Sequence, residues 1–109
     1  MKVSELAEKL KLDCLAVPMP EREITGAYAG DLLSWVMGRA EANCVWATIM
    51  NNINVLAVAS LADVAVAVIC EGCEVSDEIV QTAMKKGVNL MRTEMSVYEF
   101  CVAVSRYIS

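Results

Sequence analysis

The chain is organised around one stretch, Arg22-Glu23-Ile24-Thr25-Gly26-Ala27-Tyr28-Ala29-Gly30-Asp31-Leu32-Leu33-Ser34-Trp35-Val36-Met37. In its first half, Ile24, Gly26, Tyr28 and Gly30 alternate with other residues at period two, which is typical of a β-strand. Asp31 then predicts the start of a helix, because its carboxylate can accept from the free backbone N–H groups of the first turn. A strand, a glycine and a helix N-terminus in succession can bind an anion. The simpler interpretation is a strand-to-helix turn with a glycine hinge.

The rest of the chain alternates between strands and helices in the same way. Further strands are predicted at 14–17, 45–50, 64–69 and 88–91. Helices are predicted at 3–10, 32–37, 52–62, 76–86 and 96–108.

Capping residues mark the predicted starts of these helices. Ser4 and Ser76 are N-cap candidates, and Asn51 or Asn52 is expected to cap the helix that ends near residue 62. Ser96 and Glu99 form a capping box. These local signals support the helix assignments independently of the apolar pattern.

The order of these elements predicts a layered α/β/α sandwich with a mostly parallel sheet of about five strands. The strand at 64–69 alternates Val and Ala without a polar residue, so both of its faces should be covered. The helix at 53–62 is apolar on nearly every side, so it should be buried by the sheet and by something else. The length, 109 residues, predicts a single domain over 1–109.

Four stretches resemble the DRTGG domain family: residues 22–26, 30–38, 46–54 and 57–63. Glu21 stands where the name-giving motif has Asp, and Ala27 where it has the second Gly. The resemblance implies a regulatory domain, found alone or fused to CBS domains, phosphotransacetylases and pyrophosphatases. It also implies a fold similar to that of the N-terminal domain of HPr kinase, and no known catalytic reaction.

The composition limits the partners. Hydrophobic residues make up 57% of the chain, which is hard to hide in a small monomer and favours a homodimer. The net charge of −5 argues against nucleic acid. Asp63 interrupts the most apolar run, so no membrane span is predicted. The charged N-terminal segment is unlike a secretory signal, which predicts a cytoplasmic protein.

Polar side chains follow the predicted strands, where ligands bind in sheets of this kind. Capping accounts for Asp31, Asn52 and Ser96, whereas Asn51 and Asn54 are not fully used by it. The candidate ligand-binding residues, taken together, are Thr25, Gly26, Gly30, Asp31, Ser34, Thr48, Asn51, Asn52 and Asn54.

Catalysis has little support in the sequence. There is no histidine, no Gly-x-x-x-x-Gly-Lys-Ser/Thr phosphate loop and no Gly-x-Ser-x-Gly elbow. No cofactor and no metal are predicted. Cys70 and Cys73 form a Cys-x-x-Cys pair that could serve redox chemistry or half of a metal site, although small core cysteines are the simpler interpretation.

The sequence therefore predicts a non-enzymatic regulatory or sensor domain, acting as a homodimer and binding a small ligand, a partner metabolic enzyme or a kinase. One alternative is a nucleotide- or anion-binding module at the carboxyl edge of the strands. The other is a thiol redox or metal module using Cys70 and Cys73.

Overall fold

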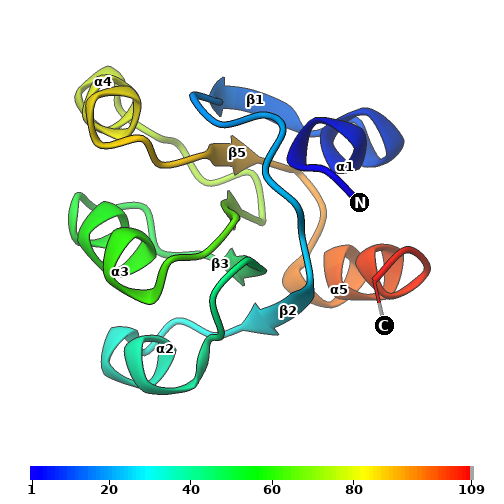
Figure 1. Cartoon of the computed structure of the whole chain (residues 1–109). Helices are drawn as coiled ribbons and strands as arrows, with labels where there is room; N and C mark the ends of the chain where they lie inside the picture. The colour runs from blue at the N-terminus through cyan, green and yellow to red at the C-terminus, as the bar shows by residue number, and fades with distance from the viewer. Residues whose placement is uncertain (109) are drawn as a thin grey trace.

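A five-stranded sheet runs through the centre of the protein in the order β1-β5-β4-β3-β2 (Figure 1). The computed structural model describes residues 1–108. Strands β2 to β5 are parallel, and β1 pairs antiparallel with β5. The strands are β1 Asp13–Ala16, β2 Gly26–Ala29, β3 Cys44–Thr48, β4 Val66–Ile69 and β5 Leu90–Arg92. The helices are α1 Val3–Leu10, α2 Leu33–Arg39, α3 Asn54–Ala62, α4 Asp77–Lys86 and α5 Val97–Ser105.

The helices form two unequal layers. Helices α2, α3 and α4 cover one face of the sheet, and α1 and α5 cover the other (Figure 1). The predicted α/β/α sandwich with a mostly parallel sheet is therefore confirmed.

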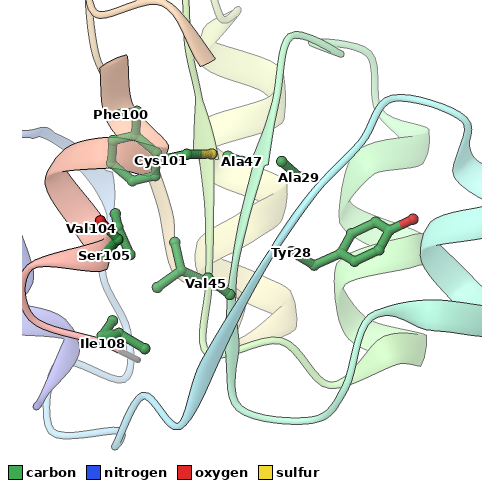
Figure 2. A pocket seen from close by; sticks show the side chains of 10 residues that line it. Tyr28, Ala29, Val45, Ala47, Phe100, Cys101, Val104, Ser105 and Ile108 are labelled. Carbon is green, nitrogen blue, oxygen red and sulfur yellow. The ribbon is translucent and has the colours of Figure 1, made fainter. Parts of the chain in front are cut away.

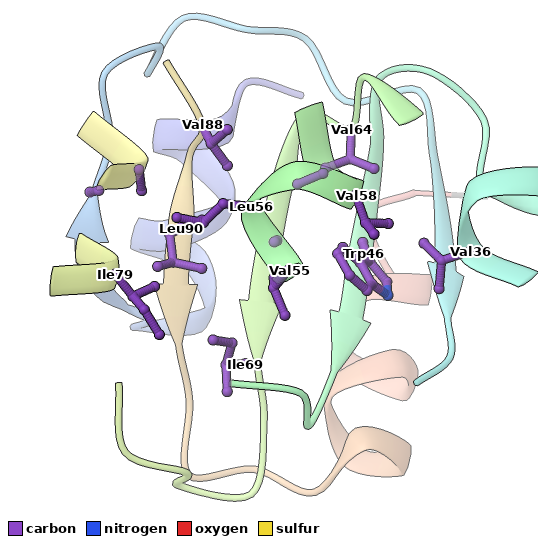
Figure 3. Close-up of a cluster of buried hydrophobic side chains, with 14 of the residues drawn as sticks. Val36, Trp46, Val55, Leu56, Val58, Val64, Ile69, Ile79, Val88 and Leu90 are labelled. Carbon is purple, nitrogen blue, oxygen red and sulfur yellow. The ribbon is translucent and has the colours of Figure 1, made fainter. Parts of the chain in front are cut away.

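Each layer has its own apolar core. On the three-helix side, Trp46 is fully buried among Val36 of α2 and Val55 and Val58 of α3 (Figure 3). On the two-helix side, the largest buried side chain is Phe100 of α5. Strands β3 and β4 are both buried along their whole length, and for β4 the unbroken apolar pattern predicts this.

Helix α3 is less completely covered than its sequence suggests. Val55 and Leu56 are fully buried, but Leu61 on its outer side is 74% exposed. The sheet and the neighbouring helices α2 and α4 thus cover only one side of α3 in a single chain.

The helix starts show where local capping rules hold. Ser76 Oγ accepts from Ile79 N at 3.3 Å, and Ser96 Oγ accepts from Glu99 N at 3.1 Å. Glu99 completes the predicted box by accepting from Ser96 N at 3.0 Å. The Ser4 cap is wrong: α1 begins at Val3, and Glu5 Oε1 accepts the N–H of Lys2 at 3.0 Å.

Replacing Ser96 with Ala should lower the free energy of unfolding by about 1 kcal/mol, because the N–H of Glu99 loses its acceptor. Denaturant melts followed by circular dichroism measure this. Ser60→Ala is the matched control, since Ser60 is exposed within α3. A Ser96→Ala loss no larger than that of the control would contradict the capping role.

Within residues 1–108, no helix is long and apolar enough to cross a membrane.

Candidate functional site

The carboxyl ends of the parallel strands meet at one edge of the sheet, here called the carboxyl edge. Backbone hydrogen bonds join the segments that follow neighbouring strands: Cys70 N donates to Thr48 O at 2.8 Å, and Gly72 N donates to Thr93 O at 2.9 Å. Gly30 N likewise donates to Ala47 O at 3.1 Å. The predicted gathering of polar residues at this edge therefore occurs, with Asp31, Thr48, Asn51 and Glu71 on adjacent segments.

Asp31 has a different role from the predicted one. Helix α2 begins at Leu33, and Asp31 caps nothing in it. One carboxylate oxygen of Asp31 instead accepts from Thr48 Oγ1 at 2.8 Å and from Ile49 N at 2.9 Å. The N-cap prediction is wrong because these partners on the neighbouring segment satisfy the carboxylate, and Asp31 ties the end of β2 to the end of β3.

Gly30 is placed by two aromatic side chains. Trp46 Nε1 donates to Gly30 O at 2.9 Å. A Cβ atom at Gly30 would lie 3.0 Å from Cε2 of Tyr28, which is tighter than ordinary contact. The glycine thus serves close packing against Tyr28 within the chain.

The side chains of Asn51, Asn52 and Asn54 have three different environments. Asn51 Nδ2 donates to Glu74 O at 2.8 Å, so its amide is used by a contact with another segment and not by helix capping. Asn52 Oδ1 accepts from Asn54 N at 2.9 Å, which orders the start of α3 although Ile53 is the N-cap residue. Asn54 is exposed on the first turn of α3, and Ser34 is exposed on the first turn of α2.

Thr25 and Gly26 lie at the other end of β2. Gly26 is the first residue of that strand and pairs with Cys44, the first residue of β3. Both line a cavity of about 450 Å³ together with Arg39 and Glu41. The predicted site residues therefore fall into two groups at opposite ends of the sheet.

Arg22 is a residue whose role the sequence does not reveal. Its guanidinium donates to Asn43 Oδ1 from Nε at 3.2 Å and from Nη2 at 3.0 Å. Nη2 also donates to the carbonyl of Asp63 at 2.6 Å and to its carboxylate at 2.7 Å. Asn43 and Asp63 both have left-handed backbones, with φ of 67° and 56°. Arg22 thus clamps the turn before β3 to the turn after α3.

Comparison with known proteins shows which solved structure has a similar fold. No family model matches the sequence, and no curated protein matches it. A similar solved structure is that of the CBS and DRTGG domains of the regulatory region of Clostridium perfringens pyrophosphatase, complexed with its activator diadenosine tetraphosphate. The TM-score is 0.73 at 10% sequence identity, over 94% of this chain and 45% of that chain.

The fold is DRTGG-like. This confirms at the level of fold the resemblance predicted from the stretch around Arg22–Gly26. The chain spans less than half of the structure that it matches.

The carboxyl edge of this DRTGG-like domain is acidic. Asp31, Glu71, Glu74 and Glu94 lie on the segments that follow the strands. Arg92 lies beside them, but its guanidinium donates to the carbonyls of Cys73 and Gly72, both at 2.8 Å. The guanidinium of Arg92 is therefore already engaged, and an anion beside it would meet the carboxylates of these four acidic residues.

Cys70 and Cys73 pack on opposite sides of the sheet. Cys70 belongs to the core beneath α1 and α5, whereas Cys73 packs against the core beneath α2, α3 and α4. Burial raises the pKa of the Cys70 thiol to about 12, and the nearby Cys101 thiol adds to this effect. Such a thiol is a poor nucleophile at neutral pH. No cluster of three or more metal-ligating acidic or thiol side chains occurs in residues 1–108.

A groove of about 250 Å³ separates α5 from the outer strand β2 (Figure 2). Its floor is Val45 and Ala47 of β3, and Ala27 and Ala29 of β2 line one side. The side chain of Tyr28 points away from the α5 side, toward α2 (Figure 2). This α5–β2 groove is mainly apolar, and the sequence pattern did not reveal it.

Proposed function

We propose that this DRTGG-like domain is a non-enzymatic regulatory module that acts as a homodimer and binds a small ligand or a partner metabolic enzyme. The observation that carries the proposal is the state of the polar groups at the carboxyl edge. Asp31 is held by Thr48 and Ile49, and Asn51 is held by Glu74. These groups join strand ends together, which suits a domain that transmits a change of shape better than one that carries out a reaction.

The fold gives further support. The Clostridium perfringens structure is a regulatory region in complex with an activator. A domain of the same fold could take the same kind of role here, passing the state of a ligand or a neighbour to an attached or associated enzyme. No pair of a nucleophile and a general base stands out among the groups described at the edge.

For a small ligand, the first-turn side chains on α2 and α3 are the best contacts at this edge. Asn54 offers two donors and an acceptor on the exposed start of α3. Ser34 adds a hydroxyl on the exposed start of α2, the helix that packs beside α3. The structure makes Asn51 a weaker candidate ligand contact than the sequence analysis suggested, because its amide already donates to Glu74 O.

A thermal-shift screen tests the ligand half of the proposal. The panel should contain adenine nucleotides, diadenosine polyphosphates, acyl phosphates and nicotinamide cofactors. A ligand at a hundred times its dissociation constant adds about 2.7 kcal/mol of stability, which gives a clear shift. Asn54→Ala should remove the shift and leave the melting temperature of the free protein nearly unchanged, whereas Ser60→Ala, on the same helix, should keep it.

Two outcomes would contradict this half. If no compound shifts the wild-type protein, a protein partner becomes the better explanation of the regulatory role. If a compound shifts the wild type and Asn54→Ala equally, the ligand binds away from the start of α3.

Nucleotide binding at the carboxyl edge is a second candidate, favoured by the activator bound to the Clostridium perfringens protein. The charge of Asp31 opposes it. Asp31→Asn should strengthen the binding of any phosphate ligand there several-fold, because a like charge about 4 Å away costs about 1 kcal/mol in water. Asparagine retains an oxygen that can accept from Thr48 and Ile49, so the fold should persist. Titration calorimetry measures the change, and equal affinity in both proteins would place the phosphate elsewhere.

A further inference from the structure

One side of this molecule is left uncovered, along the free edge of β2. Strand β2 pairs only with β3 among the described strands, and its residues Ala27 and Ala29 are exposed. On one face of the sheet it is flanked by α2, where Trp35 is 52% exposed and stacks under the guanidinium of Arg39. On the other face it is flanked by the α5–β2 groove. Strand β2 and these two flanks are called the β2 margin here.

The two edges of the sheet differ in how they are protected. Strand β1 at the far edge carries Asp13, which forms an ion pair with Arg92, and its register with β5 is interrupted between Cys14 and Ala16. Charges and irregular pairing are what proteins use to prevent contact between sheet edges. The sequence of β2, Gly-Ala-Tyr-Ala, has neither charge nor proline. Strand β2 is therefore the edge that is open to another strand.

We propose that the β2 margin is the surface on which two copies of this chain associate, with their β2 strands antiparallel across a two-fold axis. The sheets of the two copies would then continue into one another. This inference rests on the homodimer part of the proposed function and assigns its interface.

The geometry of the layers fits a second copy. Neighbouring strands lie about 4.8 Å apart, so α5, which lies over β3 and β2, would be about 10–14 Å from its equivalent in the other copy. Packed helices lie about 8–10 Å apart, so side chains on the β2 side of α5 would nearly fill the space. Cys101 and Ser105 are on that side of α5 and line the groove. Alanines at 27 and 29 leave room for this approach.

The charges along the β2 margin also favour an antiparallel arrangement of the two copies. Asp31 lies at the carboxyl edge two residues before helix α2, and Arg39 is the last residue of that helix, at its other end. An antiparallel arrangement brings the Arg39 end of one copy to the Asp31 end of the other, twice per dimer. A two-fold contact of this kind is self-complementary, as isologous interfaces require.

Light scattering during size exclusion tests the interface with three variants. Trp35→Glu places a charge on the α2 flank of the margin, and Ala29→Arg places one on strand β2 beside the groove; both positions are exposed in the single chain, so both variants should fold. Leu61→Glu is the control, because Leu61 is an exposed apolar residue of α3 outside the margin. The wild type and Leu61→Glu should run at about twice the 11.8 kDa of one chain. The two margin variants should run as monomers, with a dissociation constant at least a hundredfold higher.

The contrary outcomes are distinct from one another. A dimer that survives both margin variants, or that only Leu61→Glu dissociates, overturns the interface and leaves the homodimer standing. A monomeric wild type at micromolar concentration overturns both the interface and the homodimer. The ligand-binding part of the proposed function is tested separately by the thermal-shift screen.

Alkylation of Cys101 gives a second readout. Cys101 lines the groove, whereas Cys14 is exposed on β1, the edge strand on the opposite side of the sheet from β2. In Ala29→Arg, Cys101 should react with a maleimide at least tenfold faster than in the wild type, with Cys14 unchanged as the internal control. Equal rates at Cys101 in both proteins, measured by peptide mass spectrometry, would contradict closure of the groove by a second copy.

Discussion

Replacing Trp46 with Ala should lower the free energy of unfolding by about 3–5 kcal/mol, the largest effect expected of any single change here. Trp46 is fully buried between the sheet and helices α2 and α3. Its removal leaves a large cavity and takes the donor from the carbonyl of Gly30. A domain of this size has about 5–15 kcal/mol of stability in total, so the variant should be close to unfolding. Urea melts followed by far-ultraviolet circular dichroism measure the change.

Trp46→Phe separates the two contributions. Phenylalanine fills part of the space but cannot donate to Gly30 O, so a loss of about 1–2 kcal/mol is expected. The turn at Gly30 and Asp31 should also loosen. If Trp46→Ala were no less stable than Trp46→Phe, the cavity argument would fail.

Arg22→Ala should have the second-largest effect, a loss of about 2–3 kcal/mol. Arg22 joins two left-handed turns that are 20 residues apart in the chain, at Asn43 and Asp63. Hydrogen bonds that involve a charged group contribute about 1.5–3 kcal/mol. Arg106→Ala is the matched control, because Arg106 is exposed after α5. The same denaturant melts compare the two variants.

Two further variants locate the energy of this clamp. Arg22→Lys should recover only part of the loss, since an ammonium group cannot reproduce the forked contacts with Asn43. Asp63→Asn should cost less than about 1 kcal/mol, because the Asp63 carboxylate is 66% exposed and exposed ion pairs contribute little. A larger loss from Asp63→Asn than from Arg22→Ala would show that the ion pair, and not the clamp, carries the stability.

The sequence predicted those features that depend on neighbours in the chain. Ser76 and Ser96 cap their helices because their partners are three residues away. The unbroken apolar run at β4 shows directly that both faces are covered. The layers of the sandwich follow from these elements, since a strand–helix–strand connection leaves few other arrangements.

The features that were missed depend on contacts between distant segments. Asp31 looks like a cap, but its partner Thr48 is 17 residues away. The Asn51 amide meets Glu74, which is 23 residues away. The spacing of Cys70 and Cys73 left a working pair open as an alternative, whereas the turn between them, with φ of 65° at both Glu71 and Gly72, sends their side chains to opposite faces. Spacing in the sequence indicates neither the reach of a side chain nor the face on which it ends.

The order of the strands also determines how the protein can form during its synthesis. Strands β2, β3, β4 and β5 are neighbours in the sheet in the order in which the ribosome makes them. Strand β1 is made first, yet its only strand partner among the described residues is β5, and Asp13 pairs with Arg92. Strand β1 therefore has no strand to pair with until β5 has been translated. The sheet can form strand by strand from β2 to β5, and β1, the first of the five strands to be synthesised, is the last to pair.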